Sequence, residues 1–276
     1  MSLLTIGTFN VNSVKSRLPV LEYFLRGENA PDILCLQETK CTNENFPLAF
    51  FEQLGYNAVF RGMKSYNGVA VISRVTPEEY FFGLDDGAAM GPLKESEESR
   101  VIYARFGDLH ILNTYVPQGK ELDNPDYAYK LNFLGRVKKL LERRFKPADK
   151  VLWTGDINVA PTDLDVTHPE NKRNHVCFHK DVKEKLEDVK AWGLSDIFRR
   201  HRPGAGEFSF WDYRVPKALE RNIGWRIDHI LGTESVAKAS ADAWAVRELR
   251  AMEKPSDHTA VMASFNDMVK PGFNNF

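Results

Sequence analysis

Residues 150–161 begin with a short apolar run, which is followed by two polar residues, Asp156 and Asn158. A run of this length predicts a buried strand, and Gly155 indicates a turn where the strand ends. Side chains two residues apart on extended backbone point to the same side, so the carboxylate and the amide would face one reacting centre. The carboxylate could accept a proton from water, and the amide could donate a hydrogen bond to a charged oxygen. A turn that only closes a strand is the alternative for this pair alone.

Several other predicted strands carry chemically useful residues at their ends. These residues are Asn10 and Asn12, Glu38, Tyr115, Asp228, and the neighbours Asp257 and His258. Taken one at a time, each has an ordinary alternative as a rim, turn, cap or core residue. Taken together, they supply hard oxygen ligands, an imidazole beside carboxylates, an amide donor and a phenol. This combination favours a shared reacting centre.

Hydrolysis of a phosphodiester would use this set of groups. The diester is anionic and gains charge on its oxygens in the transition state, so a divalent cation lowers the barrier. Oxygen ligands favour Mg²⁺ or Mn²⁺ over Zn²⁺. A cationic His258 could hold a phosphate oxygen, and a carboxylate such as Asp228 would keep it cationic by raising the pKa of the ring.

Hydrophobic patterning predicts the elements that must position these residues. Besides the strand that begins at residue 150, we expect strands at residues 3–11, 32–37, 56–61, 68–73, 79–82, 101–106, 110–115, 207–213, 225–231, 241–246 and 258–265. Helical spacing predicts helices at residues 15–27, 127–145 and 181–192. The first of these helices would bury Leu18, Leu21, Tyr23 and Leu25. Two β-rich halves with interspersed helices favour two sheets packed face to face with helices outside, over a doubly wound parallel sheet.

Composition narrows the class of protein further. Of the 276 residues, 43% are hydrophobic and 27% are charged, and the formal net charge is −1. A polyanionic partner would therefore need a local basic surface. Three cysteines without a framework or metal-site spacing favour a reducing, cytoplasmic compartment. The chain shows no signal peptide and no apolar run long enough to cross a membrane, so we expect residues 1–276 to form one intracellular domain without a membrane partner.

Seven short motifs follow one another along almost the whole chain. They are TFNVN at residues 8–12, LQETK at 36–40, NGVA at 67–70, NTYVPQG at 113–119, GDINVAP at 155–161, GWRID at 224–228 and SDH at 256–258. Each motif alone is weak, but the ordered set resembles the exonuclease III-type abasic-site endonucleases of the endonuclease/exonuclease/phosphatase superfamily.

The resemblance implies both a fold and an activity. The fold would be a four-layer αββα sandwich, with two packed mixed β-sheets flanked by helices. The activity would be Mg²⁺-dependent incision of DNA on the 5′ side of an abasic site, and Mn²⁺ would substitute for Mg²⁺. Side activities would be 3′-to-5′ exonuclease and 3′-phosphatase or phosphodiesterase. The partner would be double-stranded DNA with abasic sites or blocked 3′ ends, and the enzyme would act as a monomer.

By motif position, the resemblance also implies metal ligands. Glu38 would be the principal ligand, with Asn10 and Asp257 near the metal ion. Asp156 and Asn158 are candidates for a second metal ion, and the number of metal ions stays open.

The same resemblance implies the roles of the reacting residues. Asp156 would orient or deprotonate the attacking water, and Asn158 would stabilise the pentavalent phosphorus centre. Tyr115 would assist at the phosphate or the leaving group. His258, oriented by Asp228, would hold a phosphate oxygen. Whether the base is Asp156 or the pair of His258 and Asp228 stays open.

Substrate contacts follow from the resemblance as well. Phe210, Trp211, Trp225 and Ile227 would line a pocket for a flipped sugar that lacks its base. Tyr66 would enter the minor groove. Contacts to phosphates or grooves would come from Arg17, Gln118, Lys120, Asn171, Asn174 and Arg214. For all of these residues, strand core or solvated surface is the ordinary alternative.

Residues 174–179 depart from the family pattern, because many relatives carry a Gly-containing run there. This departure could alter the balance of endonuclease and exonuclease activity. A Zn²⁺ site formed by His175, Cys177 and His179 is a weaker alternative, since no fourth ligand is evident.

Two other functions compete with DNA repair. A superfamily phosphoesterase acting on a lipid headgroup or inositol phosphate would share the metal centre but would not need the aromatic pocket. A binding module without catalysis would not need the full set of Asn, Glu, Tyr, Asp and His residues.

Overall fold

Two β-sheets of six strands each form the centre of the computed structural model, which describes residues 3–88, 96–266 and 268. The first sheet has the strand order β11-β12-β1-β2-β4-β3, and the second has the order β5-β6-β7-β8-β10-β9. One central pair in each sheet is parallel, β1 with β2 and β7 with β8, and the remaining pairs are antiparallel. Both sheets are therefore mixed.

The bounds of the elements agree with most of the predicted ranges. The strands are β1 (Leu4–Asn10), β2 (Ile33–Gln37), β3 (Asn57–Arg61), β4 (Val69–Ser73), β5 (Glu79–Phe82), β6 (Val101–Phe106), β7 (Leu109–Tyr115), β8 (Lys150–Asp156), β9 (Leu194–Asp196), β10 (Asp228–Thr233), β11 (Ser240–Ala245) and β12 (Val261–Phe265). The α-helices are α1 (Leu18–Arg26), α2 (Leu48–Gln53), α4 (Pro125–Arg144), α5 (Lys180–Lys190), α6 (Ile197–His201), α7 (Glu234–Ala239) and α8 (Arg247–Ala251). Short 3-10 helices are η1 (Lys15–Arg17), η2 (Asn43–Asn45), η3 (Asp163–Asp165) and η4 (Pro169–Asn171).

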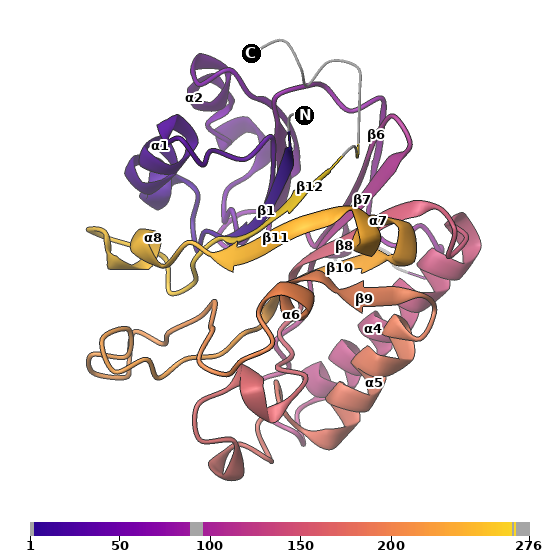
Figure 1. Cartoon of the computed structure of the whole chain (residues 1–276), viewed down its shortest axis with the longest axis vertical. Coiled ribbons are helices and arrows are strands. Elements are labelled where there is room, and N and C mark those ends of the chain that lie inside the picture. Colours follow the sequence, from indigo (N-terminus) through magenta and orange to yellow (C-terminus); the bar gives the residue numbers. More distant parts are fainter. Residues whose placement is uncertain (1–2, 89–95, 267, 269–276) are drawn as a thin grey trace.

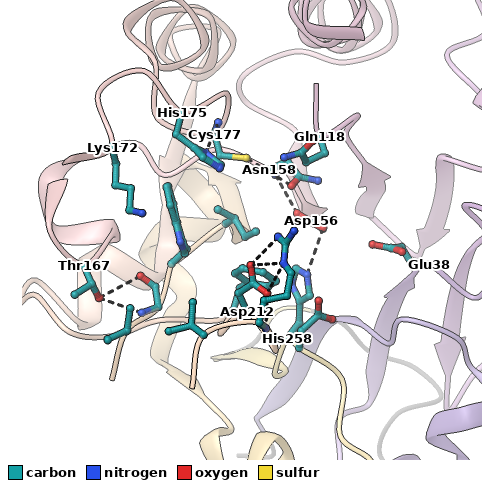
Figure 2. A pocket seen from close by; sticks show the side chains of 18 of the residues that line it. Glu38, Gln118, Asp156, Asn158, Thr167, Lys172, His175, Cys177, Asp212 and His258 are labelled. Carbon is teal, nitrogen blue, oxygen red and sulfur yellow. Dashed lines mark hydrogen bonds and ion pairs between the residues drawn. The ribbon is translucent and has the colours of Figure 1, made fainter. Parts of the chain in front are cut away.

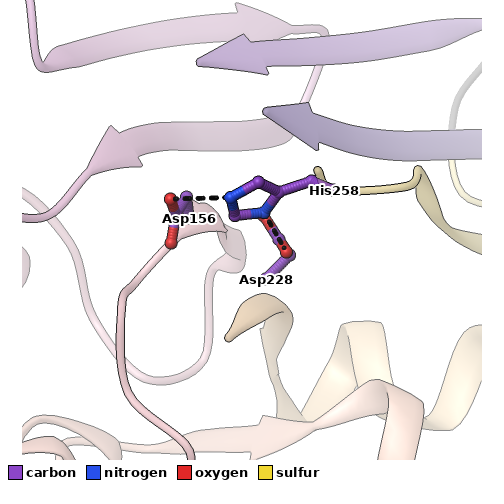
Figure 3. A group of neighbouring side chains, drawn as sticks. All are labelled: Asp156, Asp228 and His258. Atoms are coloured by element: carbon purple, nitrogen blue, oxygen red, sulfur yellow. Dashed lines mark hydrogen bonds and ion pairs between the residues drawn. The ribbon is translucent and has the colours of Figure 1, made fainter. Parts of the chain in front are cut away.

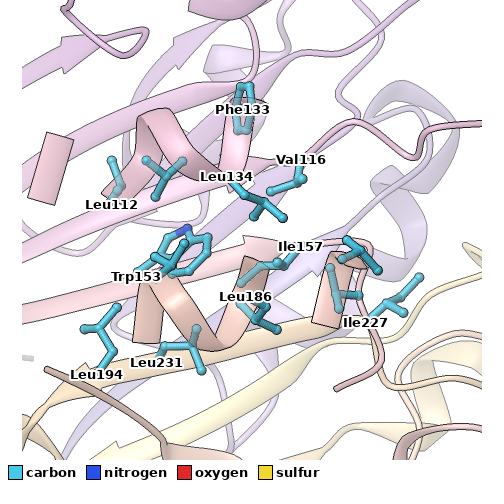
Figure 4. Packing of buried hydrophobic residues seen from close by; sticks show 14 of the residues in the cluster. Leu112, Val116, Phe133, Leu134, Trp153, Ile157, Leu186, Leu194, Ile227 and Leu231 are labelled. Atoms are coloured by element: carbon cyan, nitrogen blue, oxygen red, sulfur yellow. The ribbon is translucent and has the colours of Figure 1, made fainter. Parts of the chain in front are cut away.

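The buried side chains of the strands fall into three hydrophobic layers, because successive residues of a strand contribute to different layers. Side chains of successive strand residues point to opposite faces, so Ile33 of β2 packs between the sheets while Leu34 packs under α1 and α2. In β8, Leu152 joins the core between the sheets, and Trp153 packs against α4 and α5 (Figure 4). Each fully buried side chain of this kind contributes about 1.5–3 kcal/mol. The result is the predicted four-layer sandwich, with α1 and α2 beside one sheet and α4 and α5 beside the other (Figure 1).

Several predicted details are wrong. Tyr23 is 58% exposed, because the buried face of α1 is made by Val20, Leu21, Phe24 and Leu25. No named strand covers residues 207–213, where Phe210 makes only isolated bridges to Trp225 and His258. The strands predicted to begin at residues 225 and 258 begin later, at Asp228 and Val261. Short elements such as α2, β9, α6 and α8 were not predicted, since each is too brief to show a clear period.

Gly155 has a different role from the predicted turn. It lies inside β8, where an added Cβ would come within 1.9 Å of the carbonyl oxygen of Thr114, and its φ is +134°. Glycine is therefore needed here for the close approach of β7 and β8. β8 ends at Asp156, and Asn158, two residues later, takes the left-handed conformation with φ 54°.

Candidate active site

The strand register brings the predicted site residues to one end of the two sheets. Asn10 is opposite Gln37, and Tyr115 and Asp228 are both opposite Asp156. β10 runs antiparallel to β8, so its first residue lies beside the last residue of β8. β12 runs antiparallel to β1, so the segment before β12 reaches the same end.

Asn10 connects the two sheets at this end. Its Nδ2 donates to Oε1 of Glu38 over 2.8 Å and to Oδ2 of Asp156 over 2.9 Å. Its Oδ1 accepts from the backbone N–H of Asn12. Asn10 is fully buried, and Asp156 is 1% exposed. A single amide thus holds two carboxylates close together, although the two come from different sheets.

His258 lies between Asp156 and a third carboxylate, that of Asp228 (Figure 3). Its Nδ1 is 2.8 Å from Oδ2 of Asp228, and its Nε2 is 3.8 Å from Oδ2 of Asp156. Burial opposes protonation of the ring, but the charge of Asp228, their hydrogen bond and the charge of Asp156 outweigh it and raise the pKa of His258 to about 10. The ring is therefore a cation at neutral pH, as the sequence predicted.

Burial lowers the pKa of a histidine such as His258, but it raises the pKa of the Asp156 carboxyl group. Removal from water, followed by the charge of Asp228, raises the pKa of Asp156 to about 7, against the opposing effects of His258 and Asn10. A carboxyl group in this range can exchange a proton with a reacting water near neutral pH.

Glu38 follows β2 in the left-handed conformation, with φ 52°. The backbone N–H groups of Thr39 and Lys40 donate to the carbonyls of Gly68 and Asn67, which fixes the turn. Nζ of Lys40 lies 2.8 Å from Oε2 of Glu38 and also donates to Oδ1 of Asn12. Burial raises the pKa of Glu38, but the hydrogen bonds from Asn10 and Lys40 outweigh it and leave the pKa below its usual value. Glu38 is therefore an ionised carboxylate whose oxygens could bind a cation.

Tyr115 and Asn158 complete the polar wall. Burial, followed by the negative charge of Glu38, raises the pKa of Tyr115 well above its usual value, so the phenol keeps its proton. Asn158 donates Nδ2 to the carbonyl of Val116 over 3.0 Å, and its backbone N–H donates to Oδ1 of Asp156. The second hydrogen of Nδ2 remains for another acceptor.

These groups open into a cavity of about 490 Å³ (Figure 2). Its lining includes Glu38, Tyr115, Gln118, Asp156, Asn158, Thr167, Lys172, His175, Cys177, Phe210, Asp212, Arg214, Val215, Ile223, Gly224, Trp225, Ile227, Asp257 and His258. The cavity wall therefore combines polar groups of the strand ends with the apolar side chains of Phe210, Trp225 and Ile227, which were predicted to line a pocket.

Trp211 corrects one prediction. Its side chain is 1% exposed, packs with Phe208 and Ala218, and is not among the described residues that line the cavity. Its backbone N–H donates to the carbonyl of Asp257 over 2.8 Å. Trp211 thus lies in the core behind the site and supports the backbone of Asp257.

The other predicted DNA contacts lie around the cavity mouth or apart from it. Gln118 and Arg214 line the cavity, and Arg214 pairs with Asp212. Tyr66 is 70% exposed, and a guanidinium nitrogen of Arg17 lies 3.4 Å from the hydroxyl of Tyr213. Lys120 pairs with Asp126. Asn171 and Asn174 are exposed and are not among the described lining residues.

Sequence reasoning missed several residues of the cavity wall, among them His175 and Lys172. The ring of His175 lies 4.6 Å from the ring of Trp225, and Nζ of Lys172 lies 5.7 Å from that same indole. Both line the cavity. The departure of residues 174–179 from the family pattern was the signal that could have identified His175.

The donor chemistry fits a divalent cation on the Glu38 side of the cavity. Glu38, Asp156 and Asp257 all line it and offer hard oxygens, the ligands that Mg²⁺ and Mn²⁺ prefer. Asp156, Asp228 and His258 also offer ligand atoms within 4.8 Å of one another, and they are the only such group found in the described part of the chain. A protonated His258, however, has no lone pair for a metal. His175, Cys177 and His179 form no such group there.

Comparison with known proteins agrees with this geometry. The model of the Endonuclease/Exonuclease/phosphatase family matches residues 7–258. Exodeoxyribonuclease III of Haemophilus influenzae is 33% identical over 94% of this chain and 98% of its own length. The chain belongs to this family. Within it, the protein is of the exonuclease III type and is a phosphodiester hydrolase of DNA repair.

Solved structures of this type share the fold. An AP endonuclease from Archaeoglobus fulgidus is 43% identical, with a TM-score of 0.89 over 95% of this chain and 99% of that one. A 3′ phosphatase from Neisseria, bound to a product DNA hairpin, is 34% identical, with a TM-score of 0.87 over the same shares. In the described part of this exonuclease III-type chain, no helix combines the length and apolar character that a membrane span requires.

Proposed function

We propose that this protein is a Mg²⁺-dependent abasic-site endonuclease that cuts DNA on the 5′ side of the lesion. The cut would leave a 3′-hydroxyl and a 5′-deoxyribose phosphate. The observation that carries this proposal is that reacting groups and apolar side chains share one cavity: Asp156 and His258 line it together with Phe210, Trp225 and Ile227.

Asp156 is the base in this proposal. His258 already carries a proton at neutral pH, because Asp228 and Asp156 raise its pKa to about 10, so it cannot accept one from water. Asp156, with a pKa of about 7, can. These opposite protonation tendencies support Asp156, of the two bases that the sequence left open, as the base in this proposal.

The remaining polar groups stabilise the phosphate. His258 donates from Nε2 to a phosphate oxygen, and its charge offsets that of the anion. Asn158 donates the free hydrogen of Nδ2 to an oxygen of the pentavalent centre, and Tyr115 donates its phenolic hydrogen to the phosphate or the leaving oxygen.

A metal ion would be held by Glu38, with Asn10, Asp257 and Asp156 as its neighbours. When bound, Mg²⁺ or Mn²⁺ supplies positive charge at the phosphate oxygens. The cation requirement follows from charge: the carboxylates of Glu38, Asp156 and Asp257, which all line the cavity, would otherwise repel the anionic diester.

The apolar wall would select the lesion. A sugar without its base leaves the stack at lower cost than a normal nucleotide, and a wall of Phe210, Trp225 and Ile227 can cover its apolar face. At the rim, Arg17, Tyr66, Gln118, Lys120, Asn171, Asn174 and Arg214 would contact phosphates or grooves. We expect residues 1–276 to act as one catalytic domain, as a monomer and in the cytoplasm.

Removal of 3′ blocking groups is a second candidate activity. The ring of His175 and Nζ of Lys172 lie 4.6 Å and 5.7 Å from the ring of Trp225 on the cavity wall, where an extruded sugar would have to fit beside them. A terminal phosphate needs no such room. The 3′ phosphatase activity named for the Neisseria structure is in keeping with this alternative.

One set of substrates tests both activities. A duplex with a single tetrahydrofuran abasic analogue and a nicked duplex with a 3′-phosphate are incubated with Mg²⁺ or with EDTA. We expect Mg²⁺-dependent cleavage 5′ of the tetrahydrofuran. Removal of the 3′-phosphate without tetrahydrofuran cleavage would favour the second candidate. Intact duplexes alongside hydrolysed phosphoinositides would favour a phosphoesterase of lipid headgroups.

A further inference from the structure

Lys130 is a fully buried lysine on the inner side of α4. Its Nζ donates to the carbonyl oxygens of Gln118 over 3.0 Å, Asn158 over 2.7 Å and Val176 over 2.9 Å. The thiol of Cys177 lies 3.8 Å away. An ammonium group has three hydrogens to donate, and three main-chain carbonyls accept them.

The three carbonyls belong to three different segments around the cavity. Gln118 follows β7 and lines the cavity. Asn158 follows β8 and lines it as well. Val176 stands between His175 and Cys177, which both line the cavity. One side chain therefore joins three loops that are separate in sequence and that together build the wall around the reacting groups.

The burial of Lys130 carries a cost in free energy. Burial of an ammonium group is unfavourable and lowers the pKa of Lys130, and an apolar side chain of similar length would fill the same space without that cost. The carbonyls that it binds lie in irregular segments, which have fewer backbone partners of their own than a strand has.

The contact with Asn158 has the most direct consequence for chemistry. Asn158 holds its backbone in the left-handed conformation, with φ 54°, and its Nδ2 donates to the carbonyl of Val116. The carbonyl of Asn158 is the atom that Lys130 binds at the shortest distance of the three. When that carbonyl is held in place, the peptide plane between Asn158 and the next residue is held as well. This restricts the direction in which the side-chain amide of Asn158 points.

We propose that Lys130 is a positioning residue that holds Asn158 and the two neighbouring loops in the geometry required for phosphodiester cleavage. The proposal rests on the proposed function, since Asn158 is there assigned to the pentavalent centre. Lys130 acts through Asn158 and does not itself line the cavity among the described residues.

The kinetic test uses Lys130→Met, which keeps the chain length and removes charge and donors. Lys138→Met is the matched control, because Lys138 lies on the same helix and pairs with Asp188 at its surface. On the tetrahydrofuran duplex with Mg²⁺, we expect Lys130→Met to lower kcat by about 10- to 100-fold, with a smaller change in KM. Lys138→Met should match the wild type. A wild-type kcat in Lys130→Met would overturn the proposal.

A double-mutant cycle separates positioning from general stabilisation. If Lys130 acts through Asn158, the change Lys130→Met should lower kcat much less in an Asn158→Ala background than in the wild type. If kcat of the double variant falls by the product of the two single fold-losses, Lys130 acts independently of Asn158, contrary to the proposal.

Thiol labelling provides a readout that does not depend on activity. Cys177 is 4% exposed beside Lys130, whereas Cys35 is fully buried between the sheets. With an aromatic disulfide reagent, Lys130→Met should accelerate labelling of Cys177 and leave Cys35 unchanged. Equal acceleration of both in Lys130→Met would indicate global destabilisation. Lys130→Gln, which keeps a donor, is therefore measured in the same way, and equal acceleration of both thiols in this variant as well would overturn the proposal.

The two proposals can fail separately. If the wild type cleaves neither the tetrahydrofuran duplex nor the 3′-phosphate, the proposed function fails, while selective exposure of Cys177 still supports the role of Lys130 in holding the loops. If the wild type cleaves and Lys130→Met cleaves equally well, only the inference about Lys130 fails.

Discussion

His258 and Asp228 form a buried ion pair in which Nδ1 of the ring lies 2.8 Å from Oδ2 of the carboxylate. Asp228 is the first residue of β10, and His258 precedes β12, so the pair joins the two sheets. The folded state raises the pKa of His258 to about 10. The stability that this pair contributes is therefore fully present below the usual imidazole pKa of about 6.5 and is lost as the pH rises through about 10.

Replacement of Asp228 by asparagine should move the alkaline limit of activity. Without the carboxylate, burial disfavours the imidazolium, and the pKa of His258 should fall toward or below about 6.5. We expect Asp228→Asn to lose most activity at pH 8 and to regain part of it near pH 6. The measurement is kcat against pH for the variant and the wild type. An unchanged alkaline limb would show that His258 need not be charged.

Asp156→Asn should separate catalysis from binding. The amide cannot accept a proton, so turnover should fall by roughly 10²–10⁴-fold. Because the repulsion between the phosphate and one carboxylate is also removed, the variant should bind DNA at least as tightly as the wild type. Single-turnover cleavage and a fluorescence-anisotropy titration of the same duplex measure the two effects. A parallel loss of binding would assign Asp156 a structural role.

Glu38→Ala should raise the requirement for the divalent cation. Glu38 is the ionised carboxylate on the side of the cavity assigned to the metal, and Asn10 orients it. We expect no activity at ordinary Mg²⁺ and partial recovery at high Mg²⁺ or with Mn²⁺. The measurement is the initial rate as a function of metal concentration.

A control for Glu38→Ala comes from Glu44, an exposed glutamate in η2. Glu44→Ala should keep the wild-type dependence on metal. Equal dependence on Mg²⁺ for Glu38→Ala and the wild type would remove Glu38 from the metal site.

Much of the fold could be predicted because its central strands are long and periodic. Residues 33–37 and 150–156 show the apolar runs of strands that are covered on both faces, and these are β2 and β8. Residues 207–213 alternate like a strand, yet Phe208 and Trp211 pack into a separate small cluster with Ala218. Local pattern could not distinguish these outcomes, because tertiary contacts decide between them.

The reacting residues could be predicted from their places at strand ends, but their contacts could not. The sequence does not show that one amide, that of Asn10, binds both Glu38 and Asp156. Nor does it show that Lys130, one polar residue in an amphipathic helix, is fully buried. Both facts depend on distances across the fold that periodicity does not encode.

Gly155→Ala tests the close approach of β7 and β8. The added Cβ would lie 1.9 Å from the carbonyl oxygen of Thr114, and the backbone φ of +134° disfavours any side chain. We expect a loss of about 1–3 kcal/mol or more in the free energy of unfolding. Gly204→Ala is the control, since no atom of the described residues lies within 4 Å of the place that its added Cβ would take. Equal midpoints in urea for the two variants would contradict this account.

His175→Ala should change the balance between the two candidate activities. The ring of His175 lies 4.6 Å from that of Trp225 in the cavity wall, so its removal enlarges the space beside the indole. An extruded sugar needs this space and a terminal phosphate does not. We therefore expect the ratio of tetrahydrofuran incision to 3′-phosphate removal to rise.

The matched control for His175→Ala is Asn174→Ala, which changes the exposed neighbour that is not among the described lining residues. Both ratios are taken from initial rates on the two duplexes under identical Mg²⁺. If Asn174→Ala shifts the ratio as much as His175→Ala does, the loop as a whole sets the balance, and the space beside Trp225 does not. If neither shifts it, the specificity lies with Phe210 and Ile227 on the rest of the apolar wall, because these are the other side chains that an extruded sugar would meet.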